Sequence, residues 1–71
     1  MQAHSSHKAQ RAVLALVVFE HPSPLGAEFL AREIGAEAAE AVADLTAVGL
    51  LRCDGDAVHA TEAAIRFEAL A

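Results

Sequence analysis

The stretch from Leu30 to Leu51 constrains the fold of this chain more than any other part of it. Within it, Gly35 and Gly49 divide a run whose apolar residues recur at intervals of three and four. That interval is typical of a helix that buries one side. Between the two glycines the buried side is expected to carry Ala38, Ala41, Val42, Leu45 and Val48. Before Gly35 it is expected to carry Ala27, Leu30, Ala31 and Ile34. The pattern therefore predicts two short helices joined by a tight turn at Gly35 and Ala36.

Small apolar residues make up much of the chain. The sequence has 71 residues, 55% of them hydrophobic, and its aromatic residues are Phe19, Phe29 and Phe67. A chain of this length forms one small domain with a core that is only marginally sufficient. The abundance of alanine predicts closely packed helices. It also favours a second copy of the chain as the cover for part of the apolar surface.

A further helix is expected before this pair. Ser5 or Ser6 can cap its start, and it runs to about Glu20. The β-branched residues between Ala12 and Phe19 are also typical of a buried strand, but the pattern extends further back without a turn signal, which favours a helix. Because this helix is apolar nearly all round, it is either the central helix of the domain or one half of a dimer interface.

The proline-containing connector after this helix leaves two possible starts for the next one. Pro22 forces the chain out of helical geometry by about His21. The next helix can begin with Ser23 as its cap and a proline in its first position. It can also begin at Gly26, which we prefer because this start aligns with the apolar stripe.

A short hairpin and a last helix are expected after Gly49. The residues from Leu50 to Cys53 predict a strand, Asp54 and Gly55 are a two-residue turn signal, and the residues 56–60 predict the returning strand. Thr61 can cap the last helix, with Glu62 placed favourably against the helix dipole. The inward side of that helix is expected to carry Ala64, Ile65, Phe67, Glu68 and Leu70.

These expectations give a mainly α fold with a small β-hairpin, in the order helix, helix, helix, strand, strand, helix. The folded domain is expected to span residues 7–71, and residues 1–6 are expected to form a flexible N-terminal tail. The pattern resembles the winged helix-turn-helix superfamily of small bacterial transcription regulators. Three groups of residues carry the resemblance: Leu25 with Leu30, Ala31, Ile34 and Gly35; Val42 with Leu45 and Val48 to Leu51; and Asp54 to Asp56 with Val58 and Thr61 to Ala64.

The resemblance implies a small dimeric regulator that binds double-stranded DNA. In that superfamily the third helix enters the major groove and the hairpin, or wing, touches the backbone or minor groove. The residues expected to contact DNA are Lys8, Arg11, Arg32 and Arg52. A dimer could gather Lys8 and Arg11 from two chains into one basic strip.

The charges of the chain favour an alternative function, a winged helix that binds a protein. The net charge is −5, which repels phosphate at long range. The outward positions expected on the third helix are Glu37, Ala39, Glu40, Ala43, Asp44 and Ala47. None of these is Arg, Lys, Asn or Gln, the types that usually read bases. In this alternative, Glu37, Glu40, Asp44 and Phe29 dock a basic protein partner. The simpler interpretation is a solvated acidic face, with Phe29 packed against the proline connector.

The most apolar positions of the first and last helices predict where a homodimer would form. The residues expected in that seam are Leu14, Val18, Phe67 and Leu70. Charging Leu14 or Val18 is then expected to give a monomer or an unfolded chain.

No catalytic, cofactor or metal site is expected. The chain has no Gly-rich phosphate loop, and its paired carboxylates lie on expected helix surfaces. His4, His7, His21, His59 and Cys53 do not form a spacing typical of a metal site. Cys53 is expected to be a half-buried structural thiol. A single cysteine, the absence of a secretory signal pattern and an apolar run too short to span a bilayer predict a soluble cytoplasmic domain without membrane contact.

Overall fold

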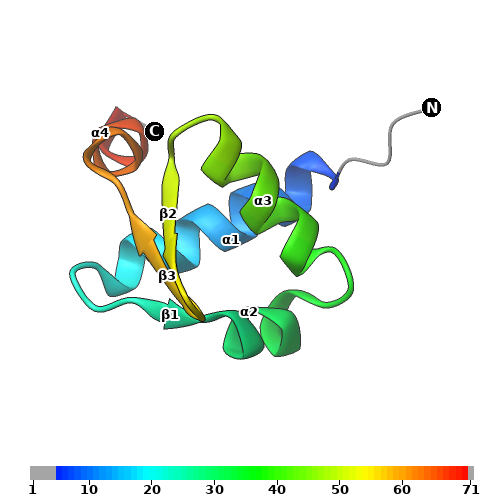
Figure 1. Cartoon of the computed structure of the whole chain (residues 1–71). Coiled ribbons are helices and arrows are strands. Elements are labelled where there is room, and N and C mark those ends of the chain that lie inside the picture. Colours follow the sequence, from blue (N-terminus) through cyan, green and yellow to red (C-terminus); the bar gives the residue numbers. More distant parts are fainter. Residues whose placement is uncertain (1–4, 71) are drawn as a thin grey trace.

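The computed structural model describes residues 5–70 and is mainly helical, with a small three-stranded antiparallel sheet (Figure 1). The sheet has the order β1-β3-β2. The elements are α1 (His7–Glu20), β1 (Leu25–Gly26), α2 (Ala27–Ile34), α3 (Ala38–Ala47), β2 (Leu51–Asp54), β3 (Ala57–Ala60) and α4 (Glu62–Leu70). The predicted order of the helices and the hairpin is confirmed, and β1 is an additional strand.

Helix α1 is the central helix of the fold. It packs against α2, α3, α4 and β3 (Figure 1). Val13, Leu14 and Val17 are buried along it. Its start is capped by Ser6, whose Oγ accepts a hydrogen bond from the Ala9 amide at 3.1 Å. The helix ends at Glu20, two residues before Pro22, as expected from the exclusion of helical geometry ahead of proline.

Helices α2 and α3 meet at the predicted turn, but α2 buries less of its stripe than expected. Gly26 is the N-cap of α2, and Gly35 ends it with a φ of 107°, a value that favours glycine. Leu30 is fully buried and Ile34 is half-buried. The other two members of the expected stripe, Ala27 and Ala31, are exposed. Their methyl groups line a groove between α2 and α3 that is described below.

The C-terminus of α3 is closed by Gly49, which has a φ of 87°. The Gly49 amide donates to the Thr46 carbonyl at 3.1 Å, and the Leu50 amide donates to the Leu45 carbonyl at 2.9 Å. This pair of bonds is the Schellman motif, which satisfies the last carbonyls of a helix. Val48 is the C-cap, and its side chain is 70% exposed rather than buried. The prediction for Val48 is wrong because the helical period no longer applies beyond Ala47.

The hairpin turn is shifted by one residue from its expected position. Asp54 pairs with Ala57, so the two-residue loop is Gly55-Asp56 rather than Asp54-Gly55. Gly55 has a φ of 63°, and no residue other than glycine has a positive φ in the described part of the chain. A positive φ at the first loop position alone is the requirement of a type II′ turn, for which glycine at that position is typical.

Strand β1 was not predicted because two residues cannot show an alternating pattern. It pairs with β3, with Leu25 opposite Val58 and Gly26 opposite Ala57. The Ala27 amide extends this pairing by donating to the Asp56 carbonyl at 2.9 Å. Backbone hydrogen bonds therefore hold the start of α2 against the hairpin.

Helix α4 begins at the predicted cap. The Thr61 Oγ accepts a hydrogen bond from the Ala64 amide at 3.3 Å and donates to the carbonyls of Gly49 at 2.7 Å and Leu50 at 3.1 Å. Ala64 is fully buried where α4 packs on the core. Thr61 thus joins the start of α4 to the chain segment that follows α3. Among residues 5–70, no helix is long and apolar enough to cross a membrane.

Replacing Gly49 by alanine is expected to lower the free energy of unfolding by about 1–2 kcal/mol, because an L residue is strained at positive φ. The matched control is Gly26→Ala, which places the same methyl group at a φ of −75° in open space. The control is expected to change stability by less than about 0.5 kcal/mol. Urea denaturation followed by circular dichroism measures both. Equal losses of stability in the two variants would contradict the positive φ assigned to Gly49.

Candidate interaction surface

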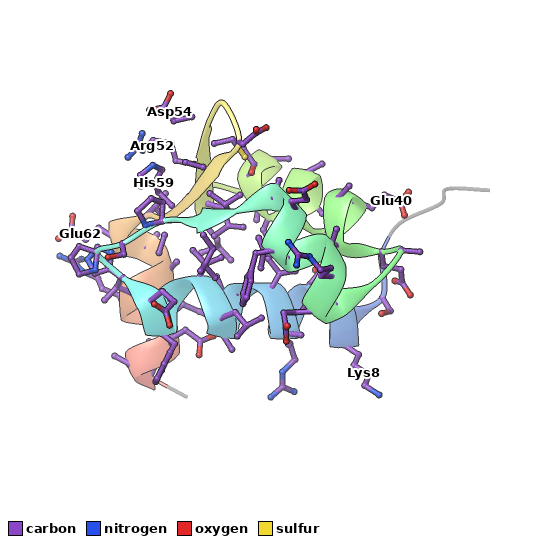
Figure 2. All side chains as sticks on the ribbon, turned by 90° about the horizontal axis from the view of Figure 1, so that it is seen from below. Lys8, Glu40, Arg52, Asp54, His59 and Glu62 are labelled. Atoms are coloured by element: carbon purple, nitrogen blue, oxygen red, sulfur yellow. The ribbon has the colours of Figure 1, made fainter. Side chains whose placement is uncertain are left out.

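The exposed side of α3 carries small side chains and a single charge. Ala38, Ala41 and Leu45 face the core, as their spacing predicts. The opposite side carries Ala39, Glu40, Ala43 and Ala47, all of them exposed. Figure 2 shows Glu40 projecting outward from this side of the molecule. The surface therefore offers methyl groups and one carboxylate, and no cation.

Asp44, predicted to face outward, instead binds the N-terminal segment. Its Oδ2 accepts hydrogen bonds from the Ser5 hydroxyl at 2.7 Å, the Ser5 amide at 3.3 Å and the Gln10 Nε2 at 3.4 Å. Asp44 is half-buried and Ser5 is only 5% exposed. The prediction that Asp44 belongs to a free docking face is wrong, because these contacts occupy its carboxylate.

Glu37 makes a second link to the same segment. Its Oε1 accepts a hydrogen bond from the Ser6 amide at 2.6 Å. Ser5 and Ser6, which were expected in the flexible tail, are thus held by two carboxylates of the α3 region. Residues 1–4 of that predicted tail lie outside the described residues. Of the three predicted docking carboxylates, only Glu40 has no hydrogen bond or ion pair within the described part of the chain.

A shallow apolar groove separates α2 from α3. It has a volume of about 180 Å³. Its lining consists of Ala27, Ala31, Ala38, Ala39 and Val42. Phe29, the predicted aromatic anchor, is on α2 and 41% exposed, and it does not line this groove. The helical period predicts that these alanines lie on one side of each helix. It does not predict that they stay uncovered by the rest of the described chain.

The predicted DNA-contact cations are not brought together. Lys8 and Arg11 lie on α1, Arg32 lies in the last turn of α2, and Arg52 lies on β2. Lys8 lines a hollow of about 430 Å³ together with Glu33 and Glu37. Arg32 is exposed at a helix C-terminus, where a cation is favourable in any helix. These four cations are therefore spread over three elements and do not form a continuous basic strip in one chain.

Arg52 lies beside a histidine that was not among the predicted DNA contacts. Arg52 is directly opposite His59 in the antiparallel register, so both side chains point to the same face of the sheet. Figure 2 shows these two side chains close together, with Asp54 beside them near the tip of the hairpin. The register of a hairpin would have revealed the pair, but the predicted loop was displaced by one residue.

The predicted dimer seam divides into core residues and exposed residues. Leu14 is 3% exposed and belongs to the core, and Val18 is half-buried against it. Leu14 therefore packs mainly within one chain, whereas Val18 keeps part of its surface exposed, and the seam stays a prediction. Phe67 is 55% exposed and Leu70 is 87% exposed, although both were also expected to face inward in one chain. Helical periodicity groups residues on one side but does not determine which side the rest of the chain covers.

Cys53 and the histidines do not converge. Cys53 is exposed on β2 rather than half-buried, with its Sγ 3.6 Å from the Thr46 hydroxyl. His7 and His21 are exposed on or after α1, and His59 is on β3. His4 lies outside the described residues. Within residues 5–70, no three His, Cys, Asp or Glu side chains are placed to hold a metal ion.

Replacing Asp44 by alanine is expected to lower the free energy of unfolding by about 1–3 kcal/mol, because it leaves the hydroxyl and the amide of the buried Ser5 without their acceptor. Glu40→Ala is the matched control on the same helix and is expected to change stability by less than about 0.5 kcal/mol. Thermal denaturation of both variants checks this. Amide exchange at Ser5 should accelerate only in Asp44→Ala, and unchanged exchange there would contradict the assigned anchoring.

No protein-family model, no curated protein sequence and no solved structure matches the chain.

Proposed function

We propose that the chain is a winged helix-turn-helix domain of the transcription-regulator type that acts by binding a protein. The order of helices, the tight turn between α2 and α3, and the β2–β3 hairpin followed by α4 support the fold assignment (Figure 1). The resemblance of the sequence to small bacterial regulators supports the class. Fold alone does not determine function, so the choice of partner depends on the surface.

The exposed side of α3 is the observation that carries this proposal. In a DNA-binding winged helix this side enters the major groove. Here it presents Ala39, Glu40, Ala43 and Ala47. Base edges are read mainly by Arg, Lys, Asn and Gln, and phosphates are bound by cations. A surface of methyl groups with one carboxylate has neither property, but it allows a second helix to approach closely.

The partner that fits this surface is an amphipathic helix with a basic flank. The groove between α2 and α3 is lined only by alanine and valine, so it accepts an apolar side chain. Glu40 lies one residue beyond Ala39, and the whole chain carries a net charge of −5. These charges favour lysine or arginine beside the apolar residues of the partner.

Direct DNA binding is the second candidate function. The specific observation in its favour is the pair formed by Arg52 and His59 on one face of the hairpin (Figure 2). In the winged helix superfamily the hairpin touches the DNA backbone or minor groove. A single arginine beside a histidine supplies few phosphate contacts, so this candidate predicts weak binding with a shallow salt dependence.

A fluorescence-anisotropy titration with mixed-sequence duplex DNA separates the two candidates. The protein-binding proposal predicts no saturable binding at low salt up to about 1 mM chain, well above the usual range of non-specific dissociation constants. Saturable binding that weakens with salt and is lost in Arg52→Ala would establish the second candidate instead.

The proposed groove is tested by nuclear magnetic resonance with a helical probe peptide of leucine and lysine, arranged with leucine on one side. Shift changes are expected to concentrate at Ala27, Ala31, Ala39 and Val42. Ala31→Glu is expected to weaken binding about tenfold by placing a charge in the groove. Ala63→Glu on α4 makes the same charge change away from the groove and should leave binding unaltered. Shift changes spread evenly over the acidic surface would overturn the proposal.

A further inference from the structure

Helices α1, α3 and α4 contribute to a small hollow that the proposed function does not use. Its volume is about 150 Å³. The apolar part of its wall is formed by Leu14 of α1, Leu45 of α3, Leu50 of the loop after α3, and Phe67 of α4. None of these residues lines the groove between α2 and α3, so the hollow is a separate feature of the surface.

The apolar wall has the size and chemistry to receive one small apolar group. Leu14 and Leu45 are buried, Leu50 is half-buried and Phe67 is exposed. A cavity of roughly 150 Å³ lined by residues of this kind can hold a molecule of the size of benzene. The hollow therefore accepts an apolar body of about six carbon atoms.

The polar part of the wall comes from α1 alone. It consists of His7, Gln10 and Arg11. These residues precede Leu14 by seven, four and three positions, so they lie on the same side of the helix as Leu14. The polar edge is thus directly next to the apolar wall, as in binding sites where a few polar groups orient a mainly apolar ligand.

The charge of this wall is positive, although the chain as a whole is acidic. Its lining contains Arg11 and no carboxylate. The hollow beside Lys8 differs in this respect, because Glu33 and Glu37 also line it. In a chain with ten acidic residues and five Lys and Arg, a concave surface with an arginine and no acid favours an anion.

Arg11 is also free to pair with a ligand. Its guanidinium makes no hydrogen bond or ion pair within the described part of the chain, and the Arg66–Glu62 ion pair does not involve it. Glu68 lines a neighbouring hollow of about 490 Å³ together with Arg11, but the two side chains are not within the 4.0 Å of an ion pair. The five donors of the Arg11 side chain are therefore unused by residues 5–70.

We propose that this hollow binds a small monocarboxylate with an apolar body of about six carbon atoms. The apolar body contacts Leu45, Leu50 and Phe67, and the carboxylate accepts two parallel hydrogen bonds from Arg11. The ligand is a free small molecule rather than a protein, because a protein partner covers about 800 Å² of surface, far more than a hollow of this size supplies.

A titration with cyclohexanecarboxylate, followed by nuclear magnetic resonance of the full chain, tests this inference. Saturable shift changes are expected at Arg11, Leu50 and Phe67, with a dissociation constant of about 1 mM or below, a range that suits a ligand of this size. Two control compounds separate the two parts of the site. Acetate has the charge without the apolar body, and cyclohexylammonium has the apolar body with the opposite charge, so each is expected to bind at least about tenfold more weakly.

Matched variants assign the binding to individual residues. Arg11→Gln is expected to weaken binding about tenfold, because it removes the charge-assisted hydrogen bonds. Lys8→Gln removes the same charge from α1 outside this hollow and should leave the dissociation constant unchanged. Phe67→Ala is expected to weaken binding about tenfold by removing apolar contact, whereas Leu70→Ala, at another exposed position of α4, should not. Circular dichroism confirms that each variant is folded.

Three outcomes would overturn the inference. The first is the absence of saturable shift changes up to about 10 mM cyclohexanecarboxylate, well above the expected dissociation constant. The second is equal binding of cyclohexanecarboxylate and cyclohexylammonium, or equal losses in Arg11→Gln and Lys8→Gln, which would exclude Arg11 as the carboxylate partner. The third is a set of shift changes confined to the α2–α3 groove at Ala31 and Ala39. The inference does not rest on the proposed function, because neither peptide nor DNA is present in this titration.

Discussion

The burial of one side of α1 is the constraint on which the rest of this structure depends. Val13 and Val17 are almost completely inaccessible to solvent, and every other helix packs against the helix that carries them. In a chain of this length a single core must serve all elements, because too little surface is buried for a second one. The positions of α2, α3 and α4 are therefore determined largely by how closely each can approach α1.

Alanine makes that close approach possible and also explains the character of the surface. Ala38, Ala41 and Ala64 are buried where helices meet the core, and their small side chains allow the backbones to come near. The same composition continues on the outer side of α3, where Ala39 and Ala43 are exposed. An apolar outer surface favours protein partners, and the acidic net charge of the chain disfavours nucleic acid.

Local signals in the sequence predicted most of the fold and less of the surface. Caps such as Ser6 and Thr61, the glycines that end α2 and α3, and the helical period all act within a few residues, so they are readable from one sequence. The anchoring of Ser5 by Asp44 joins residues 39 positions apart, and no local pattern indicates it. Similarly, the apolar rows of α1 and α4 were recognised, but their division into the buried Leu14 and the exposed Phe67 depends on how the helices cross.

The hydroxyl of Thr61 has a consequence for how α3 and α4 can move relative to each other. Its contacts at 2.7 Å and 3.1 Å with the carbonyls of Gly49 and Leu50 connect the first turn of α4 directly to the end of α3. A rotation of α4 must therefore carry the C-terminal turn of α3 with it, or break these bonds.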